Sequence, residues 1–63
     1  MIYLAAVTHD IKSNTLEATW LEETETELKR VKCRNYSVEQ KQEFADDIGD
    51  MTVAMKYIIM AGW

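Results

Sequence analysis

The sequence predicts an α+β fold, in which a three-stranded antiparallel meander is packed by one or two C-terminal helices (β-β-β-α-α). In the first half of the chain, apolar and polar residues alternate, as they do in strands with one buried face. In the second half, apolar residues recur every three or four positions, which is the period of a helix. The chain has no proline and only two glycines, Gly49 and Gly62, so no linker divides it. The 63 residues therefore form a single domain, residues 1–63.

The first two strands are expected at residues 2–11 and 16–23. The K-S-N-T segment between them supplies turn residues, because asparagine tolerates the left-handed backbone of a tight turn. A two-residue loop at Ser13-Asn14 pairs Ile11 with Leu16 and brings apolar side chains together across the hairpin, including Val7 with Trp20.

A second turn is expected near E-T-E-T, followed by a third strand at residues 27–35. A two-residue loop at Thr24-Glu25 pairs Leu21 with Leu28 and Glu17 with Lys32, which cross-strand pairing favours. In this register the helices pack on the sheet face formed by Tyr3, Ala5, Val7, His9, Ile11, Leu16, Ala18, Trp20, Val31 and Cys33. The opposite face holds a second apolar cluster, which needs a cover: Ile2, Leu4, Ala6, Leu21 and Leu28.

The helical half is expected to begin with a capping box formed by Ser37 and Gln40. After it, five apolar residues form one stripe: Phe44, Ile48, Met51, Met55 and Ile58. One unbroken helix over residues 38–62 would be about 38 Å long, whereas a compact domain of this size is roughly 27 Å across. We therefore expect a break at Gly49, with Asp50 capping a second helix.

The segment after this break is apolar on nearly every side, and Lys56 is its only charge. Such a segment is buried on several sides, so it either covers the second face of the sheet or forms a subunit interface. Its residues Val53, Met55, Tyr57 and Ile59 also alternate, which leaves a fourth strand as an alternative.

The composition favours a cytoplasmic protein. Seven basic and eleven acidic residues give a net charge of -4, which argues against general nucleic-acid binding. The single cysteine, Cys33, fits a reducing compartment. The N-terminal M-I-Y-L-A-A-V lacks the positive region of a secretory signal. The apolar segment from Met51 to Trp63 is shorter than the roughly 20 residues of a membrane span.

The residues that carry catalytic chemistry are sparse. His9 is the only histidine, and the proposed pairing does not place it beside Cys33. One cysteine and one histidine are too few for a metal site, and no glycine-rich phosphate loop is present. We therefore expect neither an enzyme nor a bound metal or cofactor.

Two charged surfaces are candidate binding sites. The first is an acidic flank on the first helix, made of Glu39, Glu43, Asp46, Asp47 and Asp50, which a basic protein could recognise. The second is a basic strand face, on which alternation groups three cations with an aromatic residue: Arg30, Lys32, Arg34 and Tyr36. Such a face could contact phosphates and stack a base.

In its small size, its acidity and the order of its elements, the chain resembles the small acidic accessory proteins of phages and prophages. Some of these proteins inhibit host defence nucleases. The resemblance implies a non-catalytic protein-interaction module, a phage-type inhibitor that presents its acidic helix to a basic, nucleic-acid-binding protein. The alternatives are a nucleic-acid-binding module that uses the basic strand, and a structural homodimer without a ligand. Surplus apolar surface favours a homodimer over a monomer.

Overall fold

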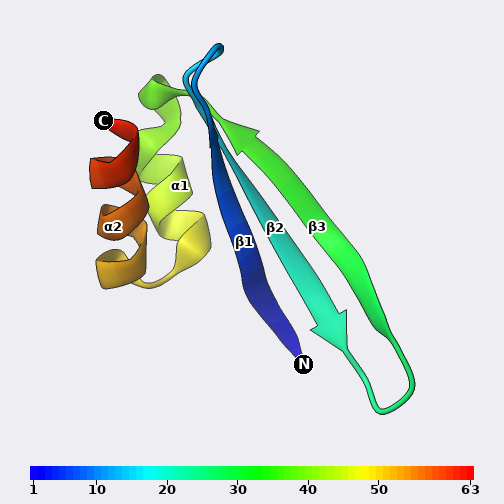
Figure 1. Ribbon diagram of the computed structural model, residues 1–63. Coiled ribbons are helices and arrows are strands. Elements are labelled where there is room, and N and C mark those ends of the chain that lie inside the picture. The colour runs from blue at the N-terminus through cyan, green and yellow to red at the C-terminus, as the bar shows by residue number, and fades with distance from the viewer.

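The computed structural model describes all residues, 1–63, and confirms the α+β fold and its element order (Figure 1). Three strands are followed by a short 3₁₀-helix, η1, and two α-helices: β1 Ile2–Asp10, β2 Thr15–Glu23, β3 Leu28–Tyr36, η1 Val38–Gln40, α1 Lys41–Ile48 and α2 Met51–Ala61. The strands form one antiparallel sheet in the order β1-β2-β3.

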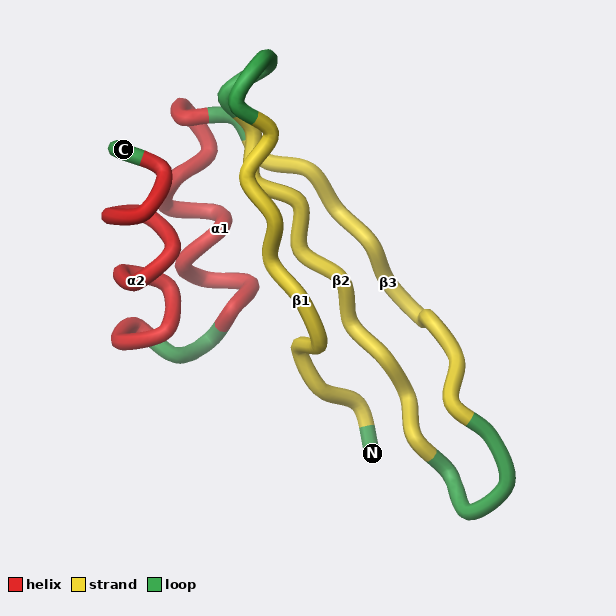
Figure 2. The backbone as a smooth tube through the Cα atoms, in the orientation of Figure 1, coloured by secondary structure: helices red, strands yellow, loops and turns green.

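Both helices pack on the same side of the sheet, and the β2–β3 hairpin extends beyond them (Figure 2). The core lies between the sheet and the helices, and it consists of Leu16, Ala18, Trp20, Tyr36, Phe44, Ala45, Ala54 and Ile58. The second helix packs beside the first and contributes Ala54 and Ile58 to this core. It therefore does not cover the second sheet face, where Leu28 remains 57% exposed.

The first hairpin has a four-residue turn, residues 11–14, so the predicted two-residue loop is wrong. Asp10 stabilises the longer turn, because its Oδ1 accepts hydrogen bonds from the backbone N–H groups of Lys12 (3.0 Å) and Ser13 (3.4 Å). Asn14 adopts the left-handed conformation, with φ 53°. Ile11 lies in the turn and is 83% exposed, so it does not belong to the core face. The observed pairs include His9 with Leu16 and Val7 with Ala18.

A β-bulge at Ala5 places the side chains at the start of β1 on the opposite sheet faces from those that alternation predicts. Leu4 pairs with Trp20 and Ala6 pairs with Thr19, so Ala5 is the extra residue. Leu4 therefore packs against the core, although alternation had assigned it to the opposite face.

The second hairpin also departs from the predicted register. Its loop, residues 24–27, is closed by hydrogen bonds from Thr24 N to Glu27 O (2.9 Å) and from Glu27 N to Thr24 Oγ1 (3.2 Å). Glu23 therefore pairs with Leu28, and the predicted pairs of Leu21 with Leu28 and of Glu17 with Lys32 are absent.

A bulge at Val31 shifts the register once more and reverses the faces of the residues after it. Leu21 pairs with Arg30, but Trp20 pairs with Lys32, so Val31 is the extra residue. The predicted burial of Val31 and Cys33 is therefore wrong, since both are exposed. The shift instead places the larger Tyr36 in the core, where it is fully buried, and this removes more apolar surface from water.

The helical half begins with the predicted capping box of Ser37 and Gln40. Gln40 Oε1 accepts a hydrogen bond from the backbone N–H of Ser37 at 3.0 Å. The Ser37 hydroxyl lies 3.3 Å from the same oxygen. The chain therefore turns into η1 and then α1 with the Ser37 N–H satisfied.

The break between the helices is confirmed at Gly49, which is left-handed with φ 78°. The segment 51–61 is a helix and not a fourth strand. Because the break resets the helical phase, the predicted single stripe does not continue through it. Phe44 is fully buried, whereas Met51 and Met55 are 59% and 41% exposed.

We predict that Asp50→Ala lowers the free energy of unfolding by about 1 kcal/mol. Asp50 caps α2, because its Oδ1 accepts hydrogen bonds from the N–H groups of Thr52 (3.0 Å) and Val53 (3.3 Å). Urea denaturation followed by circular dichroism measures the loss. Asp50→Asn is the control, since asparagine caps as well and retains most of the stability. Equal losses in both variants would contradict the capping role.

Candidate interaction site

A charged cluster joins β3 to α1, and it unites residues from both predicted sites. Arg34 Nη1 donates a hydrogen bond to Asp47 Oδ2 at 2.8 Å, and Arg34 Nη2 forms an ion pair with Glu43. Tyr36 Oη donates to the same Asp47 oxygen at 2.7 Å. The Arg34 guanidinium also lies 5.1 Å from the centre of the Tyr36 ring. The cluster holds α1 against the sheet.

The cluster shifts two pKa values in opposite directions. The hydrogen bond from Tyr36 and the positive charge of Arg34 lower the pKa of Asp47, although partial burial opposes this shift. Burial raises the pKa of Tyr36, and its hydrogen bond to the Asp47 carboxylate raises it further. Asp47 is therefore ionised and Tyr36 neutral at neutral pH.

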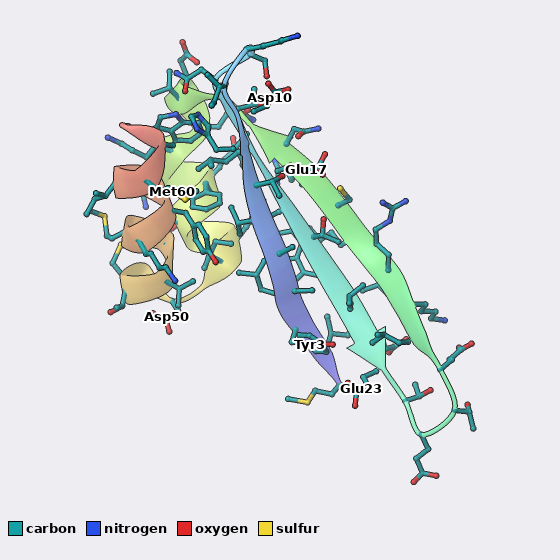
Figure 3. The ribbon with its side chains drawn as sticks, in the orientation of Figure 1. Tyr3, Asp10, Glu17, Glu23, Asp50 and Met60 are labelled. Atoms are coloured by element: carbon teal, nitrogen blue, oxygen red, sulfur yellow. The ribbon has the colours of Figure 1, made fainter.

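The cluster divides the predicted acidic flank into two groups. Glu43 and Asp47 are paired with Arg34. The other three members, Glu39, Asp46 and Asp50, are exposed and form no ion pair. Asp46 accepts a hydrogen bond only from the neutral amide of Gln42, at 3.1 Å. Asp50 lies at the start of α2 (Figure 3), where it caps the helix.

The four residues of the predicted basic strand face do not lie together. The bulge at Val31 places Lys32, Arg34 and Tyr36 on the helix side of the sheet and Arg30 on the other side. Tyr36 is fully buried, so it offers no ring for a base to stack on.

The remaining cations of this strand are also engaged. Arg34 is paired with carboxylates of α1, and the Lys32 ammonium lies 4.6 Å from the centre of the Trp20 ring. The predicted shared face is therefore wrong, because one bulge inverts the alternation on which it was based.

The C-terminus contacts the first hairpin, which sequence patterns did not indicate. Trp63 Nε1 donates a hydrogen bond to Asn14 Oδ1 at 3.1 Å, and His9 Nε2 lies 3.0 Å from the same oxygen. The Trp63 ring meets Phe44 edge to face, with 6.5 Å between ring centres. Lys41 Nζ donates to the carbonyl of Trp63 at 3.3 Å. These contacts fix the end of α2 against the turn of the β1–β2 hairpin.

An apolar groove of about 260 Å³ lies between α1 and α2 on the side away from the sheet core. It is lined by Lys41, Gln42, Ala45, Met51, Met55, Ile58, Ile59 and Trp63. The helical period alone did not reveal it, because that period assigned Met51 and Met55 to the core. No helix of the protein has both the length and the apolar character needed to cross a membrane.

No protein-family model matches the chain, and neither a curated protein nor a solved structure matches it.

Proposed function

We propose that the protein is a non-catalytic interaction module of the cytoplasm, which presents the outer flank of η1 and α1 to a basic protein. The observation that best supports this is the set of three exposed carboxylates without a cation, Glu39, Asp46 and Asp50. Glu43 and Asp46 are three residues apart on one side of α1, whereas Glu39 lies in η1 before this helix and Asp50 follows the break at Gly49.

Part of the acidic flank lies on a helix, α1, that is fixed against the sheet. Phe44 lies on the opposite side of α1 and is fully buried. Arg34 and Tyr36 hold the adjacent Asp47 from β3. Because the backbone of α1 is already ordered, a partner does not have to order it on binding, which favours affinity. The acidic flank is therefore preorganised for a positively charged surface.

The spacing of the carboxylates suggests the class of partner. Neighbouring carboxylates on a helix have β-carbons roughly 5–6 Å apart, which is comparable to the separation of successive phosphates along a nucleic-acid strand. A groove that binds phosphates with lysine and arginine could accept this flank instead. We infer a nucleic-acid-binding protein as the partner, which agrees with the resemblance to phage-type inhibitors.

The double variant Glu39→Lys, Asp46→Lys tests this function without touching the Arg34 cluster. Wild-type protein is used to capture partners from a nuclease-treated bacterial lysate, and the affinity of a captured basic protein is then measured by calorimetry. We expect the double variant to bind at least about tenfold more weakly.

The matched control is Glu23→Lys, Glu25→Lys on the far hairpin, which changes the net charge by the same amount. Both residues are exposed and form no ion pair. We expect this control to bind like the wild type. If both variants lose affinity equally, the attraction depends on net charge and the proposed flank is not the binding site.

We also propose that two copies of the chain associate, because α2 exposes large apolar side chains. Met51, Ile59 and Met60 are each more than half exposed. Contiguous apolar surface of this kind marks association sites.

A further inference from the structure

We propose that the groove between α1 and α2 receives α2 of a second copy of this chain, in a symmetric dimer with Met55 on its twofold axis. The inference rests on the proposed association and names its interface. It does not involve the acidic flank, because none of its carboxylates lines the groove.

The exposed apolar residues of α2 form a stripe along the groove. Met51, Met55 and Ile59 are four residues apart, so they lie on one side of the helix, and all three line the groove. Their exposed fractions are 59%, 41% and 72%. The floor of the groove is apolar as well, with Ala45 and Ile58. A partner surface that fits here must itself be apolar.

The stripe is complementary to itself in the antiparallel direction. A twofold axis through Met55 places each Met55 against its counterpart, and Met51 of each copy against Ile59 of the other. An interface between identical surfaces requires this kind of reciprocal pairing. Two of the three stripe residues are methionines, whose flexible side chains adapt to irregular gaps.

The charge distribution also favours the contact of a second copy with this surface over contact with other parts of the molecule. Each chain carries a net charge of -4, so two copies repel each other over most of their surfaces. No aspartate or glutamate occurs between Met51 and Ala61, and the only charge there is Lys56. The polar residues that line the groove are Lys41 and Gln42. Two acidic chains can therefore meet here without bringing carboxylates together.

The size of the groove argues against a small molecule as its occupant. Its volume of about 260 Å³ lies below the roughly 300–1,000 Å³ of typical ligand pockets. The protruding Ile59 and Met51 side chains of a second copy suit a groove of this size and character.

Sedimentation equilibrium of three proteins tests the dimer: wild type, Met55→Glu and Met60→Glu. Met60 is the matched control, because it is 54% exposed on the same helix (Figure 3) but does not line the groove. We expect the wild type and Met60→Glu to have twice the monomer mass of 7.3 kDa at micromolar concentrations. Met55→Glu places two carboxylates together at the axis, so its dimer dissociation constant should rise by roughly 30-fold or more. Circular dichroism verifies that both variants are folded.

A disulfide experiment tests the position of the axis. In a Cys33→Ser background, Met55→Cys should form a disulfide-linked dimer under mild oxidation, whereas Met60→Cys should form no disulfide crosslink. A monomeric wild type at 100 μM, or equal weakening by Met55→Glu and Met60→Glu, would overturn the proposal. Equal crosslinking at both cysteine positions would overturn it as well. The acidic-flank function is assayed separately with monomeric Met55→Glu, so the failure of one proposal is distinguishable from the failure of the other.

Discussion

Phe44→Ala is expected to remove a large part of the free energy of unfolding at 25 °C. Phe44 is fully buried, and its ring packs edge to face against Tyr36, with 5.2 Å between ring centres, as well as against Trp63. Truncating such a side chain costs about 3–5 kcal/mol. A domain of 63 residues has a total stability of roughly 3–9 kcal/mol. The loss therefore removes a large part of the free energy of unfolding.

Urea denaturation followed by far-ultraviolet circular dichroism measures this effect. The comparison is made in the Met55→Glu background, so that subunit association does not contribute to the stability. Leu28→Ala is the control, since Leu28 is 57% exposed on the far end of the sheet and should change the stability by less than about 0.5 kcal/mol. Similar losses for Phe44→Ala and Leu28→Ala would mean that Phe44 is not the centre of the core.

Arg34→Glu should lower the free energy of unfolding by about 2–3 kcal/mol at pH 7. The change removes the partner of Asp47 and Glu43 and adds a third carboxylate beside them. Removing one partner of a fully buried ion pair costs about 3–5 kcal/mol. The expected loss here is smaller, because the Arg34 side chain is 41% exposed.

Arg30→Glu is the matched control, because it makes the same charge change on the same strand. Arg30 lies on the opposite face of the sheet, is exposed and forms no ion pair. We expect it to change the stability by no more than about 0.5 kcal/mol. If the two variants lose the same stability, the effect comes from net charge and not from the cluster.

The pH dependence of stability should have opposite signs in the wild type and in Arg34→Glu. In the wild type, the folded state lowers the pKa of Asp47, so this group contributes stability above its unfolded pKa of about 3.9. That stability is lost as the pH falls through the folded pKa. In Arg34→Glu, repulsion among carboxylates is relieved by protonation, so stability should rise between pH 7 and about pH 4.

Ionisation of Tyr36 should lower the stability of the protein at alkaline pH. Its pKa is raised in the folded state, so the folded protein keeps this proton after the unfolded chain has lost it. Stability should therefore decrease above about pH 10, the ordinary pKa of tyrosine. Tyr36→Phe should show less of this decrease. Urea denaturation midpoints measured across the pH range test both the acid loss of stability from Asp47 and the alkaline loss from Tyr36.

The sequence by itself determined the fold class, the number of strands and the break between the helices. Apolar periodicity is a local property that changes from two to about 3.6 residues near Ser37, and this change separates the sheet from the helices. Gly49 and Asp50 mark the break for equally local reasons, because glycine accepts the left-handed conformation and aspartate caps the next helix. Helical spacing also predicted an acidic flank, but it did not predict that Glu43 and Asp47 are paired with Arg34.

The tertiary structure decided which faces meet, and hence the composition of the candidate site. The bulges at Ala5 and Val31 each add one residue, and one added residue moves every later side chain to the other face of the strand. The bulge at Val31 turns Tyr36 into the core and Arg34 toward α1, so half of the predicted basic face pairs with part of the predicted acidic flank. A bulge is favoured by burial across the whole core, which depends on contacts between distant residues and leaves no local pattern in the sequence.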